Sequence, residues 1–281
     1  RRLVMFVGGA YDAGYETFNY NQDNGVGAGV YMFDANTGEL LWSSYDAVKT
    51  PAVAGKTLIG DGDYLKYSVV SQIKGVDRDG DGDVDHLYFG DLGGQVFRVD
   101  LDSKHTASDT YANYAKQITR IYNGHVANGY SPRFYEMPAF TVYSDTGGLF
   151  AVISIGSGNR STPLLGKVVN ATTTNSGFIT PNETATTNDL LRKDAIYNIY
   201  DKGVIASTPP EPETSPTIDA LHQLTDTNRI SAATLATWRE VATVVGTGSS
   251  AVNYSAKSGW YYPFTSSVDV GGRKAVEKVQ G

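Results

Sequence analysis

The sequence predicts an all-β protein built from repeated antiparallel units, an organisation that is typical of a β-propeller. Its 281 residues include 19 Tyr and 31 Gly, a balance that favours strands and turns over bundles of helices. A unit made of an apolar strand that ends in Gly, a turn and a second strand recurs along the chain. Amphipathic helical spacing is confined to one region. A β-sandwich is the main alternative, and the repeat argues against it.

Three copies of the unit can be recognised. They pair residues 3–9 with 29–42, 87–91 with 93–101, and 149–156 with 195–201. A further strand is expected before each of the last two copies, at 68–73 and 138–143. Units of three to four short antiparallel strands are the blades from which propellers are built.

The first unit contains a Trp in an informative place. Asn36-Thr37-Gly38 predicts a tight turn, and Trp42 follows on the returning strand. This arrangement resembles the tryptophan-docking repeat of quinoprotein-type propellers, in which a Trp packs between adjacent blades. The simpler alternative is a hairpin with one buried Trp.

The third unit carries an insertion at about 159–258. Residues 159–190 are rich in Thr, Asn and Ser without a clear period, which predicts an exposed loop. A helical part is expected at about 215–245, with Ser215 as N-cap, Pro216 in the first turn, and a second helix near 231–245. The chain lacks an initiator Met and begins in a strand-like segment, so we treat 1–281 as one domain cut from a longer protein.

The most specific motif is an acidic loop at residues 77–85. Asp occupies its positions 1, 3, 5, 7 and 9, and Gly occupies position 6; the acidic residues are Asp77, Asp79, Asp81, Asp83 and Asp85. Ca²⁺ takes six to eight oxygen ligands, and alternate carboxylates in a tight loop can point at one centre. Gly82 permits the turn that aims the backbone carbonyl of Asp83 at that centre. We therefore expect Ca²⁺ to bind the carboxylates of Asp77, Asp79, Asp81 and Asp85 and the carbonyl of Asp83.

The loop departs from an EF-hand. Its position 12 is Tyr88, which cannot supply a bidentate carboxylate, so Asp85 is the expected replacement. The residues after the loop are β-rich and aromatic, which predicts that it joins two strands. A solvated acidic turn is the alternative, but five Asp in nine residues would repel one another without a cation. Mg²⁺ is less suitable, because it prefers to keep its waters.

The composition excludes several classes of function. A net charge of −7 supplies no basic stripe for a nucleic acid, and the absence of Cys excludes disulfides and thiolate sites. No apolar run is long enough for a transmembrane helix. The four His are scattered, and no nucleophile elbow or dinucleotide-binding motif occurs. We therefore expect a protein that is not an enzyme.

Several segments resemble the C-terminal propeller of the PilY family, the calcium-binding tip and assembly proteins of bacterial type IV pili. The specific one is the acidic loop that runs directly into residues 86–101. Weaker matches follow in the same order at 155–160, 199–202, 259–261 and 272–276.

The resemblance implies a modified quinoprotein-like propeller, complete or present as a partial ring, with one Ca²⁺ in the acidic loop. It also implies a cell-surface location at the pilus tip or outer membrane, and a role in pilus extension and retraction, adhesion and twitching motility. Minor pilins and host-surface receptors are the implied partners.

The rival function is a quinone-cofactor dehydrogenase of similar architecture. Such an enzyme needs a cofactor pocket ringed by Trp and Arg, whereas this chain has only three Trp and no vicinal Cys pair.

Overall fold

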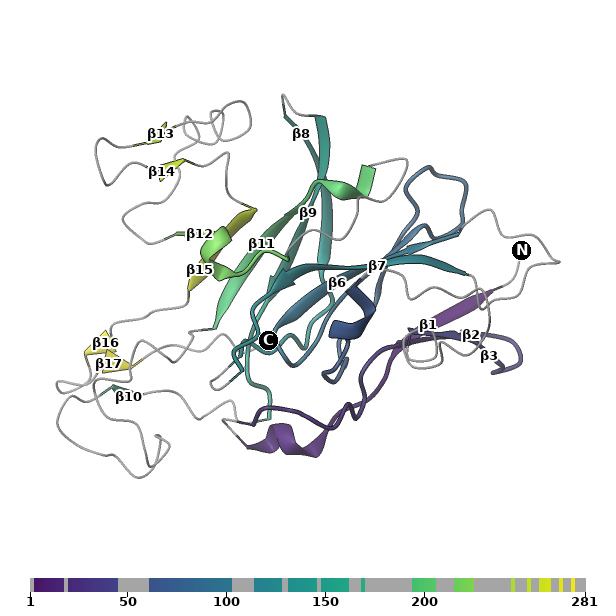
Figure 1. Ribbon diagram of the computed structural model, residues 1–281, viewed down its shortest axis with the longest axis horizontal. Coiled ribbons are helices and arrows are strands. Elements are labelled where there is room, and N and C mark those ends of the chain that lie inside the picture. The colour runs from purple at the N-terminus through teal and green to yellow at the C-terminus, as the bar shows by residue number, and fades with distance from the viewer. Residues whose placement is uncertain are drawn as a thin grey trace.

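The computed structural model describes fourteen parts of the chain, and all structural statements concern these residues. They are residues 3–17, 20–44, 61–102, 114–127, 131–145, 148–161, 168–169, 194–205, 215–224, 244–245, 252–253, 258–263, 268–269 and 274–275. Strands are the predominant regular structure among them, and the helical segments are short 3₁₀ turns (Figure 1). None of the helices is long and apolar enough to span a membrane.

Three antiparallel sheets form the body of the described structure (Figure 1). The first sheet has the order β1-β2-β3, with β1 at Val4–Gly8, β2 at Val30–Asp34 and β3 at Leu40–Ser43. The second sheet has the order β4-β5-β6-β7, with β4 at Lys74–Val76, β5 at His86–Gly90, β6 at Gln95–Leu101 and β7 at Ala115–Asn123.

The third sheet has five strands in the order β12-β15-β11-β9-β8. They are β8 (Ala139–Asp145), β9 (Gly148–Gly156), β11 (Ala195–Asp201), β15 (Gly259–Pro263) and β12 (His222–Gln223), of which β12 runs parallel to β15. Short two-residue strands form two small sheets, β10 (Val168–Val169) with β17 (Lys274–Ala275) and β16 (Val268–Asp269), and β13 (Val244–Val245) with β14 (Val252–Asn253).

The second sheet is covered on both faces, because successive side chains of a strand point to opposite sides. Leu87 and Phe89 of β5 belong to a hydrophobic cluster with Met32 and Trp42 of the first sheet. The intervening Tyr88 belongs to a second cluster, together with Ile153, Tyr197 and other residues of the third sheet. All residues of β5 and β6 are consequently buried. The three sheets therefore pack as successive layers, with the acidic loop on the central one.

Trp42 is 4 % exposed and packs in the cluster shared by the first and second sheets. This membership favours a Trp that packs between adjacent units over one buried within its own hairpin. The predicted all-β class is confirmed, since three antiparallel sheets dominate the regular structure of the described residues and the helical segments are short 3₁₀ turns. The described residues show no closed ring.

The predicted strand at 68–73 is wrong, because the strand before the loop is β4, at Lys74–Val76. Ser68 forms only an isolated bridge to Ala28. Its backbone N–H and its hydroxyl both donate to the side-chain oxygen of Gln22, and its carbonyl accepts from the N–H of Leu92. Because these groups are used locally, the segment does not join a sheet as a regular strand.

The start of the predicted helix near 215 is also wrong. Ile218–Ala220 forms a single 3₁₀ turn, η6, and β12 follows it at once. Ser215 does not cap a helix: its hydroxyl accepts a hydrogen bond from Nε of Arg120, at 2.9 Å. The helix expected near 231–245 lies outside the described residues except at β13, which is a strand. Most of the Thr-rich loop at 159–190 also lies outside them.

Candidate metal centre

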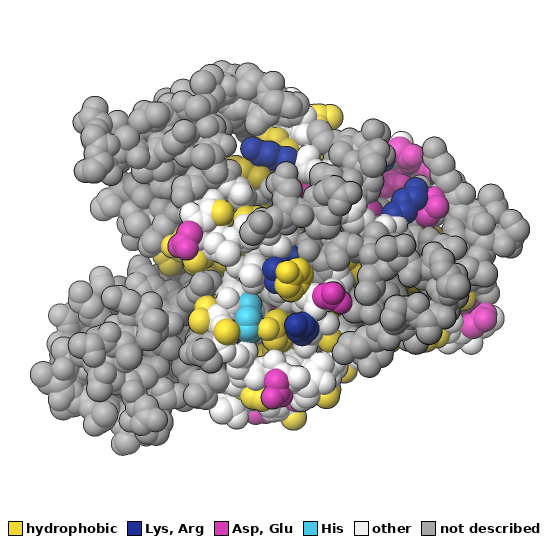
Figure 2. Space-filling view, viewed as in Figure 1, with side chains coloured by type: hydrophobic (Ala, Val, Ile, Leu, Met, Phe, Trp, Pro, Cys, Tyr) yellow, Lys and Arg dark blue, Asp and Glu magenta, His cyan; other side chains and the backbone are white. Residues whose placement is uncertain are grey.

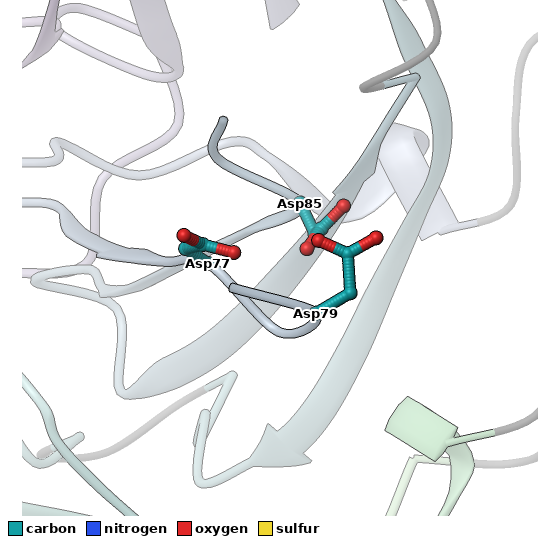
Figure 3. Close-up of side chains that lie close together, drawn as sticks. All are labelled: Asp77, Asp79 and Asp85. Atoms are coloured by element: carbon teal, nitrogen blue, oxygen red, sulfur yellow. The ribbon is translucent and has the colours of Figure 1, made fainter. Parts of the chain in front are cut away.

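The acidic loop connects β4 to β5 at one end of the second sheet. Figure 3 shows the carboxylates of Asp77, Asp79 and Asp85 lying close together around the loop. One oxygen from each of these side chains lies within 4.8 Å of the others. The structure therefore brings together three of the five acidic residues that the sequence singled out.

Hydrogen bonds within the loop bend it around Asp77. The two oxygens of this carboxylate accept the backbone N–H groups of Gly80, at 2.7 Å, and Gly82, at 2.9 Å. Gly80 and Gly82 have φ angles of 80° and 88°, in the left-handed region that glycine enters without a steric penalty. The glycine that the sequence placed at the sharp turn therefore has the expected conformation, and Gly80 shares it.

Asp85 is the member of the three-carboxylate group that the second sheet holds in place. It is 6 % exposed, and its backbone N–H donates to the carbonyl of Val76 at 2.9 Å while its carbonyl accepts from the N–H of Leu101 at 2.7 Å. One carboxylate oxygen accepts the backbone N–H of Arg78, at 2.7 Å. The sheet thus holds Asp85 in place, and the exposed part of the loop folds over it.

The oxygen separations suit a single cation. Ca²⁺–oxygen distances are about 2.3–2.6 Å, so two ligands on opposite sides of one ion lie at most about 4.6–5.2 Å apart. The three carboxylate oxygens lie no more than 4.8 Å apart, which is close enough for one ion to contact all three. An oxygen that accepts a hydrogen bond keeps a further lone pair for a metal ion, so the hydrogen bonds of Asp77 and Asp85 do not prevent binding. The donor set consists of hard oxygen atoms, which suits Ca²⁺ and disfavours softer transition metals.

The other loop residues take different positions. Asp81 is exposed and Asp83 is half-buried, and both lie outside the three-carboxylate group; Oδ1 of Asp81 accepts the backbone N–H of Asp83 at 2.8 Å. Binding through the carboxylate of Asp81 and the carbonyl of Asp83 stays a prediction. Val84 packs against the hydrophobic cluster of the first and second sheets and so anchors the loop on the fold. Figure 2 shows one gathering of Asp and Glu side chains around a basic side chain on the visible face.

Tyr88, at position 12 counted from Asp77, faces away from the loop. It is fully buried in the cluster between the second and third sheets, and its hydroxyl donates to Asp201 at 2.9 Å. The position that holds a Glu ligand in EF-hands is therefore part of the core here. This placement supports Asp85 as the replacement ligand.

A buried polar network, not predicted from the sequence, lies directly behind the loop. Arg98, 1 % exposed, donates to Asp100 on its own strand at 2.8 and 3.2 Å and to Asp201 of β11 at 2.5 Å. His86, the residue after Asp85, contacts Asp100 through Nδ1 at 2.7 Å. The alternation of charged and apolar residues in β6 was the available signal, because Arg98 and Asp100 share one face of an otherwise apolar strand.

Charge pairing holds this network in its ionised form. Burial by itself would raise the pKa of Asp100, but the hydrogen bond from His86 and the positive charge of Arg98 outweigh it and lower that pKa. Burial would likewise lower the pKa of Arg98, but the carboxylates of Asp201 and Asp100 raise it above its ordinary value. The pair of opposite charges therefore stays charged between the second and third sheets, which fixes the position of β6 against β11.

Comparisons with known proteins give a structural likeness but no match to a family model or a curated protein. The crystal structure of the Pseudomonas aeruginosa PilY1 C-terminal domain aligns with 84 % of this chain at 14 % identity and a TM-score of 0.45. The chain covers 44 % of that structure, less than half of its length. The acidic loop and the sequence motifs, rather than this overall likeness, therefore carry the function proposed below.

Proposed function

We propose that this chain is the calcium-binding, propeller-type module of a type IV pilus tip or assembly protein of the PilY kind. The observation that carries the proposal is the convergence of Asp77, Asp79 and Asp85 in a loop with the spacing of a calcium site. The sequence supports the family assignment, because the loop runs directly into the segment 86–101 that resembles PilY proteins. The three stacked antiparallel sheets are what a part of such a propeller requires.

The ion would neutralise the carboxylates that the loop gathers. Asp85 is already held by the sheet, whereas Asp77 and Asp79 are exposed. Their mutual repulsion opposes the closed loop unless a cation is present, so binding and loop order are coupled. Without a bidentate Glu at position 12, we expect a dissociation constant of about 10⁻⁷–10⁻⁵ M or weaker, towards that of extracellular calcium modules.

The proposed role is regulatory and adhesive rather than catalytic. The module would act at the bacterial cell surface, at the pilus tip or outer membrane, where calcium is abundant. Its partners would be minor pilins and host-surface receptors. Calcium occupancy would set the balance between pilus extension and retraction, and through it twitching motility.

Calorimetric titration of Ca²⁺ into two variants tests the site. Asp85→Ala removes the carboxylate that replaces the position-12 Glu, and we expect it to abolish binding. Asp83→Asn is the matched control, because it keeps the backbone carbonyl that is the expected ligand and should only weaken binding. If Asp85→Ala binds Ca²⁺ as the unaltered chain does, the assignment of Asp85 as a ligand is wrong.

The same substitution in a piliated host tests the role. Loss of calcium binding should change the amount of surface pili and the extent of twitching. Unchanged piliation and twitching would reduce the ion to a structural role. Calcium-dependent oxidation of an alcohol on addition of a quinone cofactor would favour the dehydrogenase instead.

A further inference from the structure

The acidic loop touches two sheets rather than one. It belongs to the second sheet, but the side chain of Arg78, at its second position, reaches the third. Nη1 of Arg78 donates to the carbonyl of Val204 at 3.1 Å. Val204 is buried and lies in the 3₁₀ turn η5 (Gly203–Ile205), which follows β11 of the third sheet.

Arg78 is also tied to the metal centre. Its backbone N–H donates to Oδ2 of Asp85 at 2.7 Å, so the residue that contacts Val204 with its side chain contacts a proposed calcium ligand with its main chain. Arg78 lies between Asp77 and Asp79, two further members of the three-carboxylate group. Any rearrangement of the loop around an ion therefore moves the backbone from which this guanidinium extends.

The segment that Arg78 reaches is part of the interface between the second and third sheets, which we call the seam; its polar members are Tyr88, Arg98 and Asp201. Asp201, the last residue of β11, accepts hydrogen bonds from Arg98 and Tyr88 of the second sheet. Val204 belongs to the hydrophobic cluster shared by the two sheets, as Tyr88 does. The Arg78–Val204 contact thus joins the metal loop to the end of β11 at the point where this strand meets the second sheet.

We propose that Arg78 couples calcium binding to the packing of the third sheet against the second, at the turn that follows β11. This inference rests on the proposed calcium site and adds a contact through which calcium occupancy changes the packing outside the loop. When the ion holds Asp77, Asp79 and Asp85 together, the backbone of Arg78 is fixed and its guanidinium stays on the Val204 carbonyl. Without the ion, the exposed loop relaxes and this contact is released.

The coupling is reciprocal. If calcium binding stabilises the packing of the η5 turn, tighter packing of that turn raises the calcium affinity by the same factor. A partner that pulls on the third sheet would therefore weaken calcium binding, and one that presses it against the second sheet would strengthen it. Because Arg78 is exposed, we expect an effect at the low end of allosteric couplings, about fivefold.

Hydrogen–deuterium exchange with and without saturating Ca²⁺ tests the inference. In the unaltered protein, Ca²⁺ should slow exchange both in the loop at 77–85 and in η5. The Arg78→Met variant keeps the apolar stem but loses the guanidinium donor, so Ca²⁺ should still slow exchange in the loop but no longer in η5. Saturating Ca²⁺ is needed because removal of a positive charge beside carboxylates changes the affinity by itself.

Lys74→Met is the matched control. It removes a positive charge from β4, just before the loop, and should leave the calcium effect on η5 intact. If η5 in the unaltered protein does not respond to Ca²⁺, or if Arg78→Met preserves the response, the coupling is refuted while the calcium site stands. If calorimetry detects no binding to the unaltered protein, both proposals fail.

Discussion

Asp91 should make the stability of this protein fall as the pH rises through the acidic and neutral range. Its side chain is completely buried at the end of β5, where Oδ1 accepts the N–H of Gln95 at 2.8 Å and Oδ2 accepts the side-chain amide of Gln95 at 2.9 Å. Burial is the larger influence and raises the pKa of Asp91 from the ordinary 3.8 to about 7, although these hydrogen bonds oppose it. The folded protein therefore holds a proton that the unfolded chain has already released.

The sign and the size follow from proton linkage. Between the two pKa values the folded state binds one more proton than the unfolded state, so the free energy of unfolding decreases with pH. The interval from 3.8 to about 7 is 3.2 pH units. At roughly 1.36 kcal/mol per unit, it corresponds to about 4 kcal/mol at most. This contribution is fully present below pH 3.8 and is lost by about pH 7.

Urea denaturation of the unaltered chain and of Asp91→Asn, from pH 4 to pH 8 with a calcium chelator, measures the effect. The Asn side chain has a pH-independent cost of its own, so the informative quantity is how the difference in unfolding free energy changes with pH. The unfolding free energy of the unaltered chain minus that of Asp91→Asn should fall by up to about 4 kcal/mol between pH 4 and pH 8. Asp12 and Asp100, whose pKa values are lowered, lose their contributions only at lower pH and are present in both proteins.

Asp63→Asn is the control for a change of one carboxylate, because Asp63 is exposed on the 3₁₀ turn η2 (Asp61–Tyr64). Its difference from the unaltered chain should stay nearly constant over the same range. A difference between Asp91→Asn and the unaltered chain that is equally flat would refute the reasoning. It would mean that the hydrogen bonds from Gln95 compensate fully for burial.

Two further substitutions, each measured by urea denaturation, test the buried charge network between the second and third sheets and the backbone conformation of a glycine in β15. Arg98→Met leaves two buried carboxylates without their cation and should lower the free energy of unfolding by about 3–5 kcal/mol. Lys116→Met, the control, breaks an exposed ion pair and should lower it by less than about 1 kcal/mol. Similar losses in the two variants would contradict a stabilising role for the buried network between the second and third sheets. Gly259→Ala places a Cβ 2.0 Å from the carbonyl oxygen of Asn198 at a φ of 142°, and should cost well above the roughly 1–2 kcal/mol of a left-handed residue. Gly38→Ala, at a φ of 73° with nothing within 4 Å, should cost no more than that amount.

The strands could be predicted where apolar residues were followed by a glycine turn. β1, β2, β6 and β11 lie within segments that the repeat marked out, and β5 and β9 begin one residue before theirs, because burial on one or both faces leaves a direct trace in the residue types. The loop could be predicted for a different reason, since the spacing of its acidic residues is fixed by the geometry of ligands around a hard cation. Local chemistry determines both features, so a single sequence is enough to reveal them.

The segment near residue 218 shows where local patterns fail. The spacing of Ile218, Leu221 and Leu224 fits a helix, but tertiary hydrogen bonding decides the conformation. The carbonyl of Pro216 accepts the N–H of Asn123 at 2.8 Å, and Thr217 forms a parallel bridge with Asn123. These contacts hold the chain extended beside β7, so only a single 3₁₀ turn fits before β12.

The sequence shows the two charged residues of β6 but not their partner in the buried polar network behind the loop. Arg98 and Asp201 are 103 positions apart, and nothing in either segment identifies the other as its partner. Their pairing depends on how the second sheet stacks on the third, which is decided by the apolar residues around them. Sequence reasoning therefore recovered the acidic loop but missed the network that connects it to the rest of the fold.

The position of the loop in the repeat explains why a metal ion would matter there. In the equivalent hairpin of the third sheet, between β8 and β9, Asp145 pairs with Gly148, and the sequence there has no comparable run of acidic residues. The β4–β5 hairpin spans residues 77–85 and gathers carboxylates that repel one another. The same strand that receives this loop contributes His86 and Tyr88 to the seam with the third sheet. An ion bound in this hairpin would neutralise its carboxylates, and because the strand that follows supports the neighbouring sheet, its effect would extend to the packing of two sheets.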